Sequence, residues 1–367
     1  MKTTQVFRID TVHYTPYGVN QSFPGGGRTE RINDVPIPVV ETRKVPVPGS
    51  DAQVPAISAA SFRGRLRRRI GERVIQAIFP QQAPGRYQFL ALLLSGGASL
   101  RGLRPTDEHI DLLLSWPFVY LLGGQWWTAQ IPGALRAFDS VMVTALTPPA
   151  AFMLDAAQAK IEEIAREDNA LGKAAERALR DVPTDYRGHK FTSVLSMVHK
   201  ISPELSDAEL AALPKQVRDA LATTTGGRRN KDANKTANSA DDVRESLAIG
   251  VERAPLQSWW AGGCEMTAHL REDGTLEERD EVALAALLWA YQTEFGGETF
   301  LGGKQAIGLG VAQGYVLPVA SDGAPWPQPQ RFLGWLEENR ERLLRDIEAL
   351  KDTAGYAKTG SAREEND

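Results

Sequence analysis

Five arginines lie within seven residues, and a serine stands two residues before the first of them. The stretch reads Ser-Phe-Arg-Gly-Arg-Leu-Arg-Arg-Arg over residues 61–69. The N–H groups at a helix start favour an anion, and guanidinium forks make two-point contacts with phosphate oxygens, so a helix that begins here would bind phosphate. An ordinary solvated helix face is the alternative. The expected phosphate contacts are Ser61, Arg63, Gly64, Arg65, Arg67 and Arg68.

A second stretch, residues 300–315, combines five glycines with one lysine. Glycine lets a backbone approach a ligand closely and donate its N–H groups, so this stretch also suits an anion. It is not a Walker loop, because the Gly-Lys-Ser/Thr ending is missing, and not a Rossmann fingerprint, because a helix is expected before it. A structural glycine turn is the alternative. The candidate contacts are Gly302, Gly303, Lys304, Gln305, Gly308 and Gly310.

A third stretch, residues 223–242, contains no large apolar residue and includes Arg228 and Arg229. Such a composition cannot form a packed core, so we expect the segment to be mobile when unbound. It either clamps a polyanion or is a solvated loop, and composition alone favours the loop.

Two pairs of adjacent tryptophans, Trp126-Trp127 and Trp259-Trp260, offer aromatic surfaces on which nucleobases could stack. Adjacent residues of a strand point to opposite faces of a sheet. We therefore expect these pairs to belong at least half to the core rather than to a stacking platform.

Enzyme signatures are scarce in this sequence. The five histidines have no metal-ligand spacing, and Cys264 has no obvious partner. A Gly-x-Ser-x-Gly elbow is also missing. The one weak catalytic candidate is Asp34, an acid in basic surroundings ahead of the arginine stretch. We expect a protein that is not an enzyme and has no metal or cofactor.

The charge of the chain is unevenly distributed. The formal net charge is −4, yet residues 1–80 hold 12 Lys and Arg against 6 Asp and Glu. This asymmetry predicts a local polyanion-binding face on an acidic remainder. The single cysteine and the absence of a signal peptide or a long apolar run favour the cytoplasm and no membrane contact.

Apolar spacing predicts an α+β protein. Residues 59–79 have an apolar residue at every fourth position from Phe62 to Ile78, which is typical of an amphipathic helix. Residues 5–14 mix β-branched and aromatic residues with polar ones, which is typical of a strand. Further strands are expected at residues 134–144, 246–252 and 265–270, and further helices at 87–94, 106–115, 152–180, 203–221, 281–291 and 331–351.

Taken together and in order, these segments resemble the RAMP superfamily of CRISPR-associated proteins, and within it the backbone subunit of the Cas-seven family. The family's early Pro-Gly-Ser-Ser-Leu-Lys-Gly-x-Leu-Arg motif is similar to Pro55 followed by residues 61–67, with three extra residues between proline and serine. Its middle Leu-Phe-Gly turn resembles residues 121–124. Its late Glu-x-Val-Pro-x-Gly strand resembles residues 252–255, and its closing glycine-rich loop resembles residues 301–310. The overall form is most like the type IV version.

This resemblance implies an RRM-like (ferredoxin-like) antiparallel sheet core with an inserted thumb and a helical lobe. The core would comprise residues 1–150 and 246–320, with a helical insertion at about 85–117. A helical insertion and a flexible thumb would occupy residues 151–245. Residues 321–351 would form a C-terminal helix, and residues 352–367 a disordered tail.

The resemblance also implies a function. Such subunits polymerise along a CRISPR RNA, together with other effector subunits, and present its spacer for pairing with target DNA or RNA. The thumb displaces bases at intervals, and the candidates for this role are Met197, Arg228 and Arg229. Related type III subunits cleave RNA with an aspartate in a comparable position to Asp34, so a guide-directed RNA endonuclease is one alternative. A phosphate-ligand enzyme unrelated to CRISPR is the other.

Overall fold

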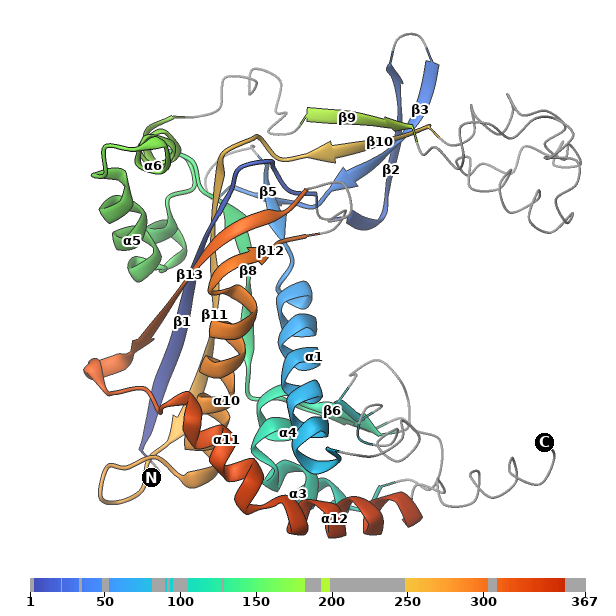
Figure 1. Cartoon of the computed structure of the whole chain (residues 1–367), viewed down its shortest axis with the longest axis vertical. Coiled ribbons are helices and arrows are strands. Elements are labelled where there is room, and N and C mark those ends of the chain that lie inside the picture. Colours follow the sequence, from blue (N-terminus) through green and yellow to red (C-terminus); the bar gives the residue numbers. More distant parts are fainter. Residues whose placement is uncertain are drawn as a thin grey trace, which may run out of the picture.

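The computed structural model describes residues 3–20, 22–32, 35–47, 53–80, 90, 93–94, 105–126, 129–181, 193–198, 248–302 and 309–353. Its centre is a seven-stranded sheet in which each recorded pairing of neighbours is antiparallel (Figure 1). In spatial order the strands are β12 (Gly297–Phe300), β13 (Val311–Ala320), β1 (Thr4–Thr15), β11 (Ser258–His269), β8 (Arg136–Met142), β5 (Gln53–Ile57) and β4 (Lys44–Pro46).

Four of these strands and two helices form a ferredoxin-like unit. Along the chain the unit runs β1, α1 (Ala59–Ile78), β8, β11, α10 (Glu278–Phe295) and β13. In the sheet its strands stand in the order β13-β1-β11-β8, which is the fourth-first-third-second order of a β-α-β-β-α-β fold. The predicted α+β class with an antiparallel ferredoxin-like sheet is therefore confirmed.

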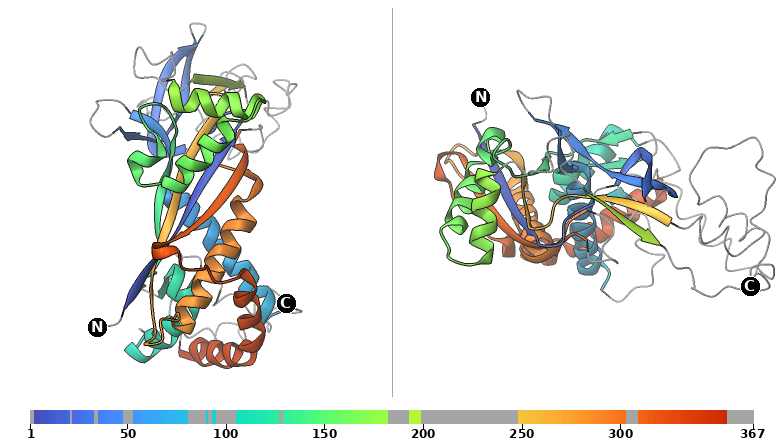
Figure 2. Two further views of the ribbon diagram at one scale, coloured as in Figure 1. Left: turned by 90° about the vertical axis from the view of Figure 1, so that its left-hand side faces the viewer. Right: turned by 90° about the horizontal axis from the view of Figure 1, so that it is seen from above.

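Strand β1 separates two hydrophobic cores because its successive side chains point to opposite faces. Phe7 and Ile9 belong to the larger core, together with α1 and α10. Val12 belongs to the smaller core, with α5 (Asp155–Ala165) and α6 (Ala170–Arg180). Figure 2 shows the two pairs of helices on opposite sides of the sheet. The helical period expected over residues 152–180 thus gives two helices.

Helix α1 forms where its apolar spacing predicts it. The residues at every fourth position, Phe62, Leu66, Ile70, Val74 and Ile78, are all buried. The arginines between them consequently project toward the edges and the outer face of the helix.

Helix α5 is attached to the sheet by a buried carboxylate. Its N-cap residue, Leu154, makes no side-chain hydrogen bond to the helix. Asp10 of β1 accepts hydrogen bonds from the backbone N–H groups of Ala156 and Ala157 instead, at 3.2 and 3.3 Å. The Nε of Arg8 lies 2.7 Å from Asp10 Oδ1. Burial raises the pKa of Asp10, and the charge of Arg8 opposes that shift.

A smaller sheet gathers distant parts of the chain. Its order is β2 (Ser22–Ile32), β3 (Val35–Thr42), β10 (Ala248–Arg253) and β9 (Ser193–Val198). Strands β3 and β10 pair in parallel, with Val39 opposite Gly250. The stretch between β1 and α1 therefore supplies two strands of this sheet and two of the central one. A two-stranded sheet joins β6 (Gly124–Trp126) to β7 (Ala129–Ile131).

The remaining helices are shorter than α1 and α10. The helix expected at 106–115 is α3 (Asp107–Ser115), which Thr106 caps, and α4 (Pro117–Leu122) follows it. Two single 3-10 turns are η2 (Pro149–Phe152) and η5 (Ser321–Gly323). The single helix expected at 331–351 is two helices, α11 (Pro329–Glu338) and α12 (Arg340–Thr353), which meet at Asn339. The helix expected at 203–221, and most of that at 87–94, lie outside the described residues. Within the described part of the chain, no helix is long and apolar enough to cross a membrane.

Candidate nucleic-acid interface

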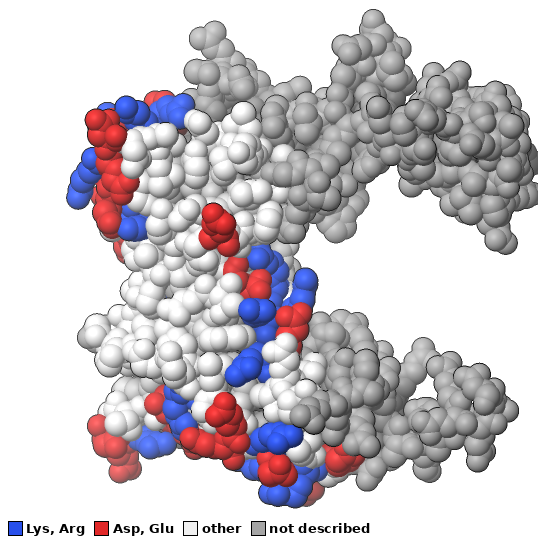
Figure 3. Space-filling model, viewed as in Figure 1, with Lys and Arg blue, Asp and Glu red and all other residues white. Residues whose placement is uncertain are grey.

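A cavity of about 630 Å³ opens between the first half of α1, the end of α10 and the stretch that follows β12. Figure 3 shows basic side chains, with acidic ones among them, on the strip of surface where Figure 1 draws α1. The cavity brings together two motifs that lie far apart in the sequence. The predicted contacts that line it are Ser61, Gly64, Arg65, Arg68 and Gly302.

Backbone N–H groups in the first turn of α1 already donate hydrogen bonds to acceptors within the protein. The Ser58 side chain accepts a hydrogen bond from the Ser61 N–H at 3.2 Å, as an N-cap residue does. Asp139 of β8 accepts the Ala59 N–H at 2.7 Å, and its other oxygen pairs with Arg43 at 2.8 Å. A carboxylate and a hydroxyl of the protein therefore accept from the Ala59 and Ser61 amides in this structure, so these two N–H groups are not free to bind an anion.

Arg65 is tied to the end of α10 and to β12. Its Nη2 lies 3.1 Å from Glu294 Oε2 and 3.2 Å from the Glu294 carbonyl oxygen. It also donates to the Phe300 carbonyl and, at 3.3 Å, to the Thr299 hydroxyl. The guanidinium carbon lies 4.6 Å from the centre of the Phe295 ring. Burial lowers the pKa of Arg65, while the Glu294 charge opposes that change. Arg65 thus fixes α1 against the start of the glycine-rich stretch.

The other predicted arginines divide into one that is bound internally and two that are exposed. Arg67 donates to the Leu122 carbonyl at the end of α4, and burial lowers the pKa of its guanidinium. Arg63 and Arg68 are exposed, and neither makes an ion pair or hydrogen bond with another residue that the structure describes. These two guanidinium groups are the ones available to a ligand without rearrangement.

The glycine-rich stretch is closed at its base by backbone contacts. The Leu301 N–H donates to the Gly310 carbonyl at 2.7 Å, and the Gly310 N–H donates to the Gly18 carbonyl at 2.9 Å. Gly302 and Gly310 have φ values of 66° and 80°, which favour glycine. A Cβ at Gly302 would also overlap the carbonyl oxygen of Asn20. Gly302 and Gly310 are therefore required by the backbone, whatever the stretch binds.

His13 of β1 is fully buried next to the aromatic residues that border this cavity. Its ring centre lies 6.1 Å from that of Phe62 and 6.0 Å from that of Phe295. Burial, reinforced by the charge of Arg65, lowers the pKa of His13 to about 3. The imidazole is consequently neutral at physiological pH and belongs to the core.

The tryptophan pairs do not form a stacking platform. Trp126, Trp259 and Trp260 are all fully buried, and the Trp260 indole N–H donates to the Thr15 and Ser258 hydroxyls at 3.1 Å. The predicted core placement is confirmed for these three residues, since β6 and β11 bury them. Trp127 lies outside the described residues.

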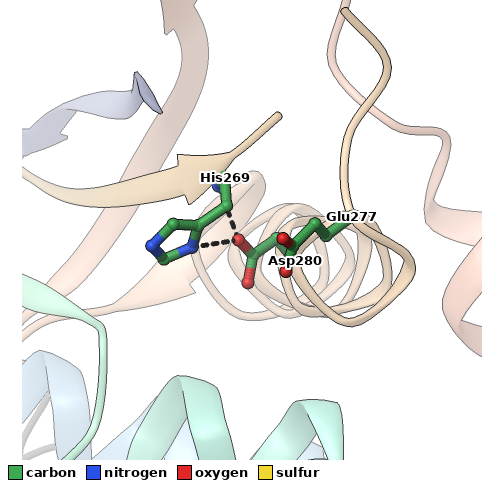
Figure 4. A group of neighbouring side chains, drawn as sticks. All are labelled: His269, Glu277 and Asp280. Atoms are coloured by element: carbon green, nitrogen blue, oxygen red, sulfur yellow. Dashed lines mark hydrogen bonds and ion pairs between the residues drawn. The ribbon is translucent and has the colours of Figure 1, made fainter. Parts of the chain in front are cut away.

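One cluster of potential metal ligands, His269, Glu277 and Asp280, was not evident from the sequence spacing (Figure 4). The buried Asp280 accepts the His269 backbone N–H at 2.6 Å, and the same oxygen lies 2.8 Å from His269 Nδ1. Its other oxygen lies 3.6 Å from Arg279 Nε. These contacts fasten the end of β11 to the first turn of α10, so we assign the cluster a structural role.

Several predicted residues fall elsewhere in the chain. Met197 lies in β9, opposite Ile249 of β10. Sequence reasoning missed Glu294 and Asp139, because an acid in a helix or strand carries no mark of its distant partner. The candidates outside the described residues are Asp34, Arg228, Arg229, Gly303, Lys304, Gln305 and Gly308.

Comparison with known proteins gives similarity in structure alone. The chain matches no protein-family model, and no curated protein matches it in sequence. One similar solved chain belongs to a structure described as "Type IV-B CRISPR Complex", with 15% identity, a TM-score of 0.45 and coverage of 89% of this chain and 96% of that one. Another is Csc2 of Thermofilum pendens, with 10% identity, a TM-score of 0.33 and coverage of 96% of this chain and 77% of that one.

Proposed function

We propose that this chain is a CRISPR-RNA-binding backbone subunit of a CRISPR effector ribonucleoprotein in the cytoplasm. Many copies coat one guide RNA and present its spacer for pairing with target DNA or RNA, and the subunit itself cleaves nothing. The observation that carries the proposal is the cavity that is lined by both Arg68 of α1 and Gly302 of the glycine-rich stretch. The order of the sequence motifs supports it independently.

The chemistry of this cavity suits a grip on RNA that does not depend on sequence. Phosphate contacts position a nucleic acid, whereas contacts with base edges specify its sequence. Arg68 lines the cavity, and Arg63 lies on α1 outside the lining; both offer exposed guanidinium groups. Lys304 and Gln305 are proposed to add further contacts from the glycine-rich stretch. Base pairing by the guide would then supply the specificity.

The rest of the assembly follows from the same proposal. A thumb within residues 151–245, with Met197, Arg228 and Arg229 as candidates, would displace bases at intervals along the guide. Other effector subunits would cap the filament of copies. No metal or cofactor enters this scheme.

The double change Arg63→Ala with Arg68→Ala tests the proposed phosphate contacts. Each lost contact with single-stranded RNA is expected to reduce the slope of log K against log salt by about 0.7, because fewer counterions are released. Binding of a labelled guide RNA, measured by fluorescence anisotropy between low and moderate salt, gives that slope.

The matched control is Arg166→Ala, which removes an exposed arginine of similar type from the other side of the sheet, just after α5. It is expected to leave both affinity and salt slope unchanged. Equal slopes for the wild type and the double variant would remove Arg63 and Arg68 from the binding site.

A further inference from the structure

Glu294 places a carboxylate among the cations of the cavity. It lines the cavity from the last turn of α10, and its side chain is 22% exposed. Its Oε2 lies 3.1 Å from Arg65 Nη2, and its Oε1 lies 3.6 Å from Arg69 Nε. Each carboxylate oxygen therefore faces a different arginine of α1.

The Glu294 carboxylate contacts Arg65 and Arg69 in the way that a bound phosphate would. Carboxylates and phosphates offer arginine the same pair of anionic oxygens, and both accept from the guanidinium fork. A phosphate can contact Arg65 or Arg69 fully only if Glu294 gives up its own contact with that residue.

The two arginines are held with different strength. Arg65 has the Glu294, Thr299 and Phe300 acceptors described above. Arg69 lies just outside the cavity, in an adjoining pocket that shares Glu72 with it. Its side chain is 38% exposed, its other ion pair, with Glu72, is longer, at 3.8 Å, and its guanidinium carbon lies 5.7 Å from the centre of the Trp289 ring. Arg69 is thus the easier of the two to redirect toward a ligand, while Arg65 remains in place.

We propose that Glu294 is a built-in phosphate substitute, which occupies Arg65 and Arg69 while the cavity holds no ligand and is displaced from Arg69 when a phosphate chain binds. Its role is to set specificity. A single phosphate merely exchanges one ion pair for another, so it gains little. A chain of phosphates also reaches Arg68 and can displace Glu294. That RNA is the natural chain rests on the function proposed above, whereas the exchange itself concerns any polyphosphate.

The test compares Glu294→Gln with the wild type, using two probes: sodium tripolyphosphate and a single-stranded RNA of guide length. Removing the competing carboxylate is expected to tighten both probes about tenfold, because a like charge beside the ligand is removed. The salt slope for RNA is expected to stay the same, because the bound chain contacts Arg69 in both proteins and only the competing carboxylate differs. Inorganic phosphate is expected to bind the variant measurably better than the wild type. Isothermal titration calorimetry measures the affinities for tripolyphosphate, RNA and inorganic phosphate.

Glu298→Gln is the matched control. Glu298 is exposed on β12, four residues after Glu294, and it makes no ion pair with an arginine that the structure describes. The substitution therefore removes the same charge without breaking such a pair. It is expected to change either affinity less than twofold. A tightening by Glu298→Gln equal to that by Glu294→Gln would show a general charge effect and overturn the proposal.

The two probes separate this inference from the proposed function. Tighter tripolyphosphate binding by Glu294→Gln, with RNA bound by neither protein, supports the phosphate substitute and contradicts the RNA-binding function. RNA bound by the wild type with no tightening of either probe keeps the function and overturns the substitute. If Glu294→Gln does not fold, Glu294→Asp is measured instead, because its shorter side chain cannot reach both Arg65 and Arg69. It is expected to bind tripolyphosphate and RNA more tightly than the wild type does. Affinities for both probes that are equal to or weaker than those of the wild type overturn the proposal.

Discussion

Replacing Arg65 by alanine is expected to lower the free energy of unfolding by about 3 kcal/mol, because it removes a half-buried cation and takes a charged donor from each of its acceptors. Those acceptors include the Glu294 carboxylate and the Glu294 and Phe300 carbonyls. They belong to the C-terminus of α10 and to β12, so the variant separates α1 from the glycine-rich stretch. Denaturant unfolding at pH 7 measures the loss.

Two further variants show whether Arg65 acts through its geometry. Arg65→Lys keeps the charge but has three donors and no planar group to stack on Phe295, so it is expected to recover less than half of the stability. Arg68→Ala removes an exposed arginine three residues away and is expected to change stability by less than about 0.5 kcal/mol. If Arg65→Ala unfolds at the same denaturant concentration as Arg68→Ala, Arg65 does not hold these elements together.

Mild acid is expected to destabilise the protein through His13. The folded-state pKa of His13 is lowered to about 3, whereas an unfolded chain binds this proton near pH 6.5. The unfolded state therefore binds more protons between these pH values. The free energy of unfolding is therefore unaffected by His13 well above pH 6.5, where the imidazole is neutral in both states, and it declines as pH falls toward 3. Linkage gives a loss of about 1.4 kcal/mol at pH 5.5 and about 2 kcal/mol at pH 5.

The measurement is denaturant unfolding at several pH values between 7.5 and 5. His13→Leu supplies a neutral side chain of similar volume at the same buried position. Its stability is expected to vary with pH less steeply than that of the wild type in this window, whatever its absolute value. Parallel curves for the two proteins would assign the acid sensitivity to other groups.

The elements of the ferredoxin-like unit could largely be predicted from local patterns. Residues 59–79 form α1 because their apolar residues recur every fourth position, and residues 5–14 lie within β1 because they alternate. Thr106 begins α3 because its hydroxyl accepts the N–H of His109. Each of these signals lies within a few residues of the structure that it specifies.

The contacts within the site could not be predicted in the same way. Arg65 was expected to bind phosphate, yet Glu294 is its partner, and nothing local in either segment indicates the pairing. Asp139 likewise occupies the start of α1 from a strand 80 residues away. Sequence shows which side chains carry charge, whereas the fold decides which of those charges neutralise each other. The four-stranded sheet could not be predicted either, because its strands β3 and β10 are far apart in the sequence.

The most direct test of the central proposal is the composition and size of the protein purified from cells that express it with its CRISPR array. Absorbance at 260 and 280 nm, combined with light scattering, measures both. The proposal predicts a particle rich in nucleic acid and many times heavier than the 40.1 kDa chain. A monomer free of nucleic acid under these conditions would contradict it.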